Sequence, residues 1–170
     1  MALRFVPFGP AHFAELASWF TSEADVVRWG GSQLHYPLDA AQLDTMVGCG
    51  TTDRPGISSW MISDGADLVG HGQLRFDWRN GNATLTRIAV APARRGAGLA
   101  GPIVGRLIGL AFAYPDIARL ELNVFALNRP AIRTYERAGF KVEGRRRSAT
   151  IVEAERWDVV VMGLLRSERR

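Results

Sequence analysis

Two short turn signals constrain the fold of this chain more than any other feature. Asp64-Gly65 and Asn80-Gly81 are dipeptides typical of tight β-hairpin turns. They separate three strand-like runs, over residues 57–63, 68–78 and 83–91. Because a hairpin turn joins neighbouring strands, these runs predict an antiparallel meander in the middle of the chain.

The residues before the meander predict one more strand and two helices. Residues 3–8 are typical of a short strand, and apolar residues recur over 13–20 at the spacing of one helix face. Residues 25–39 show no clean period, so we expect a loop there with at most one helical turn. A second helix is expected over 38–47, with Asp39 as its N-cap.

After the meander, helical and strand patterns alternate. The sequence predicts, in order, an apolar helix, a strand, a second helix and two closing strands, at 101–114, 119–125, 129–139, 140–149 and 155–165. The predicted fold class is therefore α/β, with one mixed, mostly antiparallel sheet and flanking helices. We expect a single domain over residues 1–170, since no stretch resembles a linker.

Composition excludes few classes of protein. The chain has 170 residues, of which 47% are hydrophobic and 22% charged, as in ordinary globular domains. No run approaches the roughly 18 apolar residues that cross a bilayer, and Pro7, Gly9 and Pro10 interrupt any apolar core of a signal peptide. Cys49 is the only cysteine and forms no internal disulfide. We therefore expect a cytoplasmic location.

The formal net charge is +4, with 21 basic and 17 acidic residues. An excess of positive charge suits either a polyanionic ligand or nucleic acid. Because the basic residues are scattered along the chain, composition alone does not choose between these two partners.

The stretch "RRGAGLAG", Arg94 to Gly101, contains G-x-G-x-x-G, and Glu121 follows twenty residues later. This glycine spacing, followed by an acidic residue, matches the sequence motif of a dinucleotide-binding site. However, Pro92 and two arginines intervene between the strand and the first glycine, and Glu121 lies in the middle of its strand. An antiparallel meander also precedes the loop, and too few residues follow for the rest of such a fold. These details argue against NAD, although a glycine loop before a helix still favours a phosphate group.

Parsed from Arg95, the same loop spells R-x-x-G-x-A after "RIAVAP". In this form it resembles the acyl-CoA diphosphate loop of the GCN5-related N-acetyltransferase (GNAT) family. The segment "NRPAIRTYERAGF", Asn128 to Phe140, resembles that family's second motif, N-x-x-A-x-x-x-Y-x-x-x-G-F. The resemblance covers residues 68–165. The stretch "DVVRWGG" is similar to the branch with ribosomal-protein N-terminal acetyltransferases and antibiotic or small-amine acetyltransferases.

The resemblance implies an acetyl-CoA-binding core over residues 68–165 and an acceptor-side part over 1–67. Backbone amides of the loop would hold the diphosphate of coenzyme A, and the strand around Ile88 would pair with the pantetheine arm after splaying from the strand around Leu122. An N–H near Val90 would donate to the thioester oxygen. The residues implied to bind the cofactor are Ile88, Ala89, Val90, Arg95, Gly96, Ala97, Gly98, Leu99, Ala100 and Asn128.

Two of the implied roles have a structural alternative. Asn128 would hydrogen-bond the pantetheine or the splayed backbone, or it is simply the N-cap of the following helix. Tyr135 would be the catalytic acid that protonates the departing thiolate, or it packs with Ile132 and Phe140 as part of an apolar helix face.

No catalytic base is predicted. The titratable residues considered for this role are Asp77, Glu121, His71 and His35, and each is expected to be structural. A chain of water molecules could remove the proton of the amine instead, or the amine could bind in its neutral form. The residues considered for the acceptor pocket are Trp29, His35, Tyr36 and Trp60.

The resemblance implies transfer of an acetyl group from acetyl-CoA to a primary amine of a small molecule or protein N-terminus, by direct attack in a ternary complex and without a metal. The expected partners are acetyl-CoA and an amine, with no membrane or nucleic acid, and a homodimer is an assembly to test. Two alternatives stay open: a non-catalytic acyl-CoA-binding domain, and an arginine-rich RNA- or ribosome-binding module suggested by residues 144–148 and 166–170.

Overall fold

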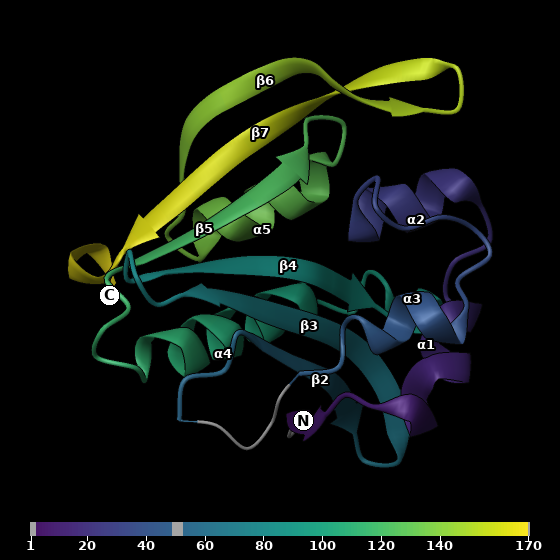
Figure 1. Cartoon of the computed structure of the whole chain (residues 1–170), viewed down its shortest axis with the longest axis horizontal. Helices are drawn as coiled ribbons and strands as arrows, with labels where there is room; N and C mark the ends of the chain where they lie inside the picture. Colours follow the sequence, from purple (N-terminus) through teal and green to yellow (C-terminus); the bar gives the residue numbers. More distant parts are fainter. Residues whose placement is uncertain (1–2, 49–52, 170) are drawn as a thin grey trace.

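The protein, a computed structural model described over residues 3–48 and 53–169, is built on one seven-stranded sheet. The strand order is β1-β2-β3-β4-β5-β7-β6, and every neighbouring pair is antiparallel except β4 and β5 (Figure 1). The predicted fold class, α/β with a mixed, mostly antiparallel sheet, is confirmed. The strands are β1 (Leu3–Pro7), β2 (Ile57–Asp64), β3 (Asp67–Asp77), β4 (Asn82–Val90), β5 (Arg119–Phe125), β6 (Lys141–Val152) and β7 (Glu155–Leu165).

The helices form two groups around this sheet. The first, α1, α2 and α3, gathers at the end of the sheet at which β4 ends (Figure 1). In the second, α4 packs on β3 and β4 and against α5. The helices are α1 (Phe13–Ser18), α2 (Glu23–Gly30), α3 (Ala40–Asp44), α4 (Ala100–Phe112) and α5 (Arg129–Arg137), with short 3-10 turns at 10–12, 92–94 and 166–168.

The two hairpins form where their turn residues predicted. Gly65, between β2 and β3, has φ +64°, and Gly81, between β3 and β4, has φ +67°. A side chain strains this left-handed conformation, so glycine suits both turns. The antiparallel meander is therefore confirmed.

The expected loop over residues 25–39 is wrong at its start, because α2 covers residues 25–30. The Ser22 hydroxyl accepts a hydrogen bond from the Asp25 N–H at 3.2 Å, and Gly31, at φ +81°, ends the helix. Val26 and Val27 are both buried but belong to different hydrophobic clusters. Because adjacent residues face two separate cores, the helix lacks the single apolar face on which the prediction relied.

The parallel strands β4 and β5 pair only at their beginnings. Residues 82–84 of β4 pair with residues 119–121 of β5, and pairing stops there although both strands continue. β3 and β4 also shift register between His71 and Gln73, and Arg87 of β4 has φ +53°. Such an irregularity bends and twists a strand. The sheet therefore opens between the carboxyl ends of β4 and β5.

Two hydrophobic clusters hold the helices on the sheet. Ile103 and Leu107 of α4 are fully buried with Leu74, Leu120 and Met162 of the sheet. A second cluster joins α1, α2 and α3 to β2 and β3. Its fully buried members are Leu16, Val26, Leu43, Met46 and Met61. The first cluster includes Leu85 of β4 and Leu122 of β5, so strands on both sides of the opening share one core.

Candidate active site

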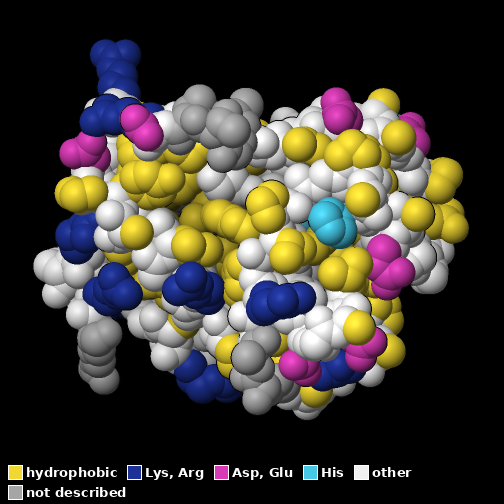
Figure 2. All heavy atoms as spheres, turned by 90° about the horizontal axis from the view of Figure 1, so that it is seen from below, with side chains coloured by type: hydrophobic (Ala, Val, Ile, Leu, Met, Phe, Trp, Pro, Cys, Tyr) yellow, Lys and Arg dark blue, Asp and Glu magenta, His cyan; other side chains and the backbone are white. Residues whose placement is uncertain are grey.

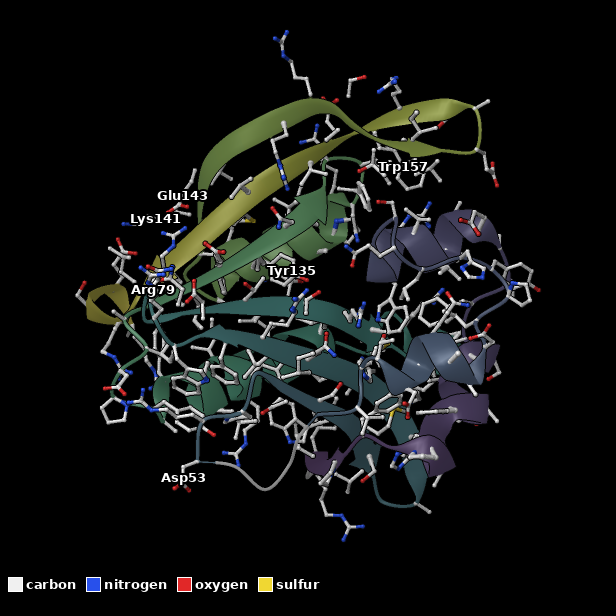
Figure 3. The ribbon with its side chains drawn as sticks, viewed as in Figure 1. Asp53, Arg79, Tyr135, Lys141, Glu143 and Trp157 are labelled. Carbon is white, nitrogen blue, oxygen red and sulfur yellow. The ribbon has the colours of Figure 1, made fainter. Side chains whose placement is uncertain are left out.

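A cavity of about 300 Å³ lies in the opening between β4 and β5. Residues 85–88 of β4 and 123–125 of β5 form two of its walls, and the end of α2 forms a third. Figure 3 shows Tyr135 between β5 and β4, and Tyr135 lines the cavity together with Asn128. The two polar residues of the second predicted motif thus lie in one site.

A smaller cavity of about 230 Å³ adjoins the first. Ile88 and Asn128 line both cavities, and so do Arg28 and Trp29. The smaller cavity is also lined by Ala89, Val90 and Arg95. The structure therefore brings the predicted cofactor strand, the start of the glycine loop and Asn128 to one place.

The glycine loop leads into α4 with four of its backbone amides free. Gly96 and Gly98 have φ +79° and +76°, and a Cβ added to either would meet no atom within 4 Å. The N–H groups of Gly96, Gly98, Leu99 and Ala100 donate to no atom of the described chain. No side chain caps the helix, while Leu99 is 1% exposed and anchors the loop in the core. Free amides at a helix N-terminus attract an anion.

The two arginines before the loop have different surroundings. Arg94 donates to the Asp64 carboxylate at 2.9 Å and lies 3.5 Å from a carboxylate oxygen of Asp67. Arg95 is exposed and its Nε donates to the Val90 carbonyl at 3.4 Å. Arg94 is thus engaged in holding the loop to the β2–β3 hairpin, and Arg95 keeps most of its guanidinium available.

Asn128 caps α5. Its Oδ1 accepts a hydrogen bond from the Ala131 N–H at 3.3 Å. This is the structural role considered above, and it coexists with the position of Asn128 in the lining of both cavities. The side-chain amide nitrogen makes no hydrogen bond within residues 3–48 and 53–169, so it is free to donate to a ligand.

Tyr135 combines packing with a free polar end. Its ring lies 6.1 Å from that of Phe140 in an edge-on arrangement, as expected for an apolar helix face. Burial raises the pKa of Tyr135 to about 12. The hydroxyl consequently keeps its proton at neutral pH, as a proton donor must.

None of the four residues considered as a base lines either cavity. Asp77 accepts hydrogen bonds from Asn80 in the hairpin turn. Glu121 pairs with Arg119 at 3.3 Å, at the closed end of the opening. His35 is exposed in the segment between α2 and α3.

His71, the fourth, is fully buried. Its Nδ1 lies 2.7 Å from the Arg87 carbonyl oxygen and therefore carries the proton, and its Nε2 lies 3.2 Å from the Ser59 hydroxyl. Burial lowers the pKa of His71 to about 4. Both ring nitrogens are thus used inside the protein.

Of the residues considered for the acceptor pocket, Trp29 lines both cavities, whereas His35, Tyr36 and Trp60 line neither. Sequence reasoning missed several polar residues of the larger cavity: Arg28, Arg87, Asn123 and Arg146. Arg28 lies in α2, which the sequence did not predict, whereas Arg87, Asn123 and Arg146 lie on predicted strands. None of the four was considered for the acceptor pocket. Only the observed splaying of the sheet turns them toward one cavity.

A wide groove of about 780 Å³ runs between α4 and α5. Gly101 and Gly105 of α4 line one side, and charged residues of both signs lie along the rest: Arg137, Lys141, Arg169, Glu136 and Glu168. Lys141 pairs with Glu168, so Arg137 and Arg169 supply the positive charge of this groove.

No set of three or more His, Cys, Asp or Glu side chains suited to a metal ion occurs within the described part of the chain. The expectation that no metal takes part stays a prediction. None of the described helices is long and apolar enough to cross a membrane.

Comparisons with known proteins agree with one another. The model of the acetyltransferase (GNAT) family matches residues 13–140. The chain is 28% identical to the L-amino acid N-acetyltransferase AaaT of Escherichia coli over 112 residues, 65% of this chain and 69% of that protein. It is 31% identical to the uncharacterized N-acetyltransferase YokL of Bacillus subtilis over 152 residues, 88% and 84% of the two chains. A spermidine N-acetyltransferase of Vibrio cholerae, solved with CoA and spermine, has a TM-score of 0.81 at 19% identity, covering 98% and 96%.

Proposed function

The chain belongs to the acetyltransferase (GNAT) family and is an acetyl-CoA-dependent N-acetyltransferase; from this premise we propose which of its residues carry the acetyl transfer. The family model spans three quarters of the chain, and the site has the parts that the reaction needs. One observation carries the proposal: β4 and β5 separate around a cavity that Tyr135 lines, next to a loop with free amides.

Coenzyme A is held first by its diphosphate. The free N–H groups between Gly96 and Ala100 and the dipole of α4 favour two negative charges there. Arg95 adds a charge-assisted contact. The pantetheine arm then lies against Ile88, Ala89 and Val90, which β5 leaves unpaired. The groove between α4 and α5, with Arg137 and Arg169 in its lining, takes the remainder of the nucleotide.

The chemical step is direct attack in a ternary complex. The neutral amine attacks the thioester carbonyl carbon, forming the C–N bond, while the carbonyl oxygen takes the negative charge and accepts from an N–H near Val90. The C–S bond then breaks, and the thiolate takes the proton of the Tyr135 hydroxyl. Water returns a proton to Tyr135 and accepts the one that the amine loses.

The acceptor is a primary amine. The relative from Escherichia coli is named for L-amino acids and the structural neighbour for spermidine, so both names describe acetylated amines. We extend to this chain only that common chemistry, with a small molecule or a protein N-terminus as the acceptor. Asn128 orients the pantetheine while it caps α5.

Three further points belong to this proposal. Residues 68–165 form the acetyl-CoA-binding core and residues 1–67 the acceptor side of a single domain. The location is cytoplasmic, consistent with a single cysteine. A homodimer is the assembly to test; a Vibrio cholerae neighbour is described as a dodecamer, which is a property of that protein.

The two alternatives are not favoured. A non-catalytic acyl-CoA-binding domain gives no reason for a free tyrosine hydroxyl in the cavity. The arginine run that suggested nucleic acid is partly engaged, because Arg145 pairs with Asp158 at 2.6 Å and Arg146 donates to Asn123 at 2.8 Å. On the face in Figure 2, basic side chains are interspersed with hydrophobic and uncharged ones, and acidic ones lie nearer the edges.

The test is release of free coenzyme A from acetyl-CoA with a panel of primary amines. The proposal expects amine-dependent release, and saturable binding of acetyl-CoA without an amine. Binding without turnover on every amine would favour the non-catalytic alternative. Failure to bind acetyl-CoA at millimolar concentration would contradict the proposal altogether.

A further inference from the structure

The larger cavity has an unusual charge balance for a site that takes an amine. Three arginines line it, and its lining contains no aspartate or glutamate. Arg28 comes from α2, Arg87 from β4 and Arg146 from β6. Positive charge therefore approaches the cavity from three separate elements, where a cationic acceptor such as a polyamine would need negative charge.

Arg87 is the most telling of the three. It is half-buried, and it pairs with no carboxylate among the residues that the structure describes. Within the described residues its side chain makes one hydrogen bond, which it donates to the Gln73 amide oxygen at 3.5 Å. Burial, with a smaller contribution from Arg75, lowers the pKa of Arg87. A desolvated cation without a partner is unfavourable, and an anionic ligand would relieve that cost.

The backbone holds Arg87 in place at some cost. Its φ of +53° is the left-handed conformation, which disfavours a residue with a long side chain by about 1 kcal/mol or more. The N–H of buried His71 donates to the Arg87 carbonyl at 2.7 Å and ties this irregular turn of β4 to β3. Arg87 also directly precedes Ile88, the residue shared by both cavities. An anion on Arg87 would therefore sit next to the proposed thioester site.

The other donors surround the same space. Arg146 donates to the Asn123 side chain at 2.8 Å, which leaves most of its guanidinium free. The Arg28 guanidinium forms an ion pair with the Asp25 carboxylate at 3.4 Å, and its Cζ lies over the Trp157 ring, 5.4 Å from the ring centroid. Trp29 lines the cavity, and its indole Nε1 is buried without a partner in the described chain. Besides the arginines, the cavity thus has an unpaired indole N–H in its lining.

We propose that the acceptor carries a carboxylate beside its primary amine, as an α-amino acid does, and that Arg87 and Arg146 bind this carboxylate. This inference rests on the proposed function, since it assigns the acceptor of that same site. The cavity volume of about 300 Å³ suits a small molecule. With the carboxylate on the arginines, the amine reaches toward Ile88 and the thioester. Repulsion from the same guanidinium groups disfavours a polyamine.

The test compares each amino acid with its amide and with the amine that lacks the carboxyl group, together with spermidine. We expect kcat/KM for the amino acid to exceed that for its amide by about 10- to 100-fold, the worth of a hydrogen bond to a charged group. Arg87→Gln should remove most of this preference. The control is Arg79→Gln, which removes an equal charge from an exposed site in the β3–β4 hairpin, away from Tyr135 (Figure 3).

The outcomes separate the inference from the function on which it rests. Equal activity on amino acid and amide, or a preference for spermidine, overturns the inference while acetyl transfer stands. An unchanged acid-to-amide ratio in Arg87→Gln, with acetyl-CoA affinity like that of wild type, overturns the role of Arg87. Absence of acetyl-CoA binding in the wild-type protein overturns both. A preference that Arg87→Gln loses and Arg79→Gln keeps supports the inference.

Discussion

Replacing Gly98 with alanine separates ligand binding from backbone strain. Gly98 has φ +76°, and an added Cβ would meet nothing within 4 Å. Gly65, in the β2–β3 turn, has φ +64° and equally open surroundings, so Gly65→Ala is a matched control. A side chain in the left-handed conformation costs about 1–2 kcal/mol. Both variants should therefore lose similar stability, about 2–4 °C in Tm for each kcal/mol in a chain of this size.

The two variants should differ in affinity for coenzyme A. The open space beside Gly98 is where we place the diphosphate, next to the free N–H groups of the loop. A methyl group there displaces the phosphate from at least one amide. A hydrogen bond to a charged group is worth about 1.5–3 kcal/mol, so Kd should rise about 10- to 100-fold. No ligand is proposed near Gly65, and Gly65→Ala should bind as wild type does.

Isothermal titration with coenzyme A and a thermal melt on the same samples measure both quantities. The reasoning predicts matched losses in Tm and a rise in Kd for Gly98→Ala alone. If both variants bind coenzyme A within twofold of wild type while both are destabilised, the loop does not hold the diphosphate and the assignment is wrong.

Three further predictions concern single side chains. Tyr135→Phe should lower kcat about 100-fold or more, as removal of an acid catalyst does, and should leave the affinity for acetyl-CoA unchanged. The control is Tyr114→Phe, because Tyr114 packs against Phe76 and Trp78. Equal losses of kcat in both variants would refute the acid role of Tyr135. The pKa of His71 is about 4 in the folded protein, below its ordinary value of 6.5, so between these pH values only the unfolded chain binds the proton. The free energy of unfolding should therefore fall by up to about 3 kcal/mol from pH 6.5 to pH 4. Urea unfolding of His71→Gln should lack that loss, and an equal pH dependence in the variant and the wild type would contradict the prediction. Arg166→Met should lower the free energy of unfolding by about 2–4 kcal/mol, because the guanidinium donates to three main-chain carbonyls around the end of α4. Urea unfolding measures this loss. A change below about 0.5 kcal/mol, within the range of ordinary surface substitutions, would contradict the prediction.

α2, the helix that the sequence analysis did not predict, shows why the periodicity of apolar residues can fail to identify a helix. α2 carries a start signal, Ser22 followed three residues later by Asp25, and a stop signal at Gly31. Those two signals could have identified it. The apolar period did not, because Val26 and Val27 pack into different clusters. Elsewhere one apolar face packs on one core, and the predicted helices and strands formed.

The candidate site was predictable where a backbone conformation has a residue signature. Glycines in the loop and Asn128 before α5 mark free amides and a helix start, and both lie at the cavities or beside them. No comparable signature in the sequence indicated that Arg87 would line a cavity. Its position depends on the register shift in β4 and on His71 buried beneath it, which are products of the whole sheet. Charge inside the acceptor cavity was therefore visible only in the structure.

The most direct test of the account is a crystal structure with coenzyme A bound. The account predicts the diphosphate on the amides of Gly96 to Ala100, the pantetheine along Ile88 to Val90, and the sulfur within hydrogen-bonding distance of the Tyr135 hydroxyl. A diphosphate bound elsewhere, or a sulfur remote from Tyr135, would contradict it.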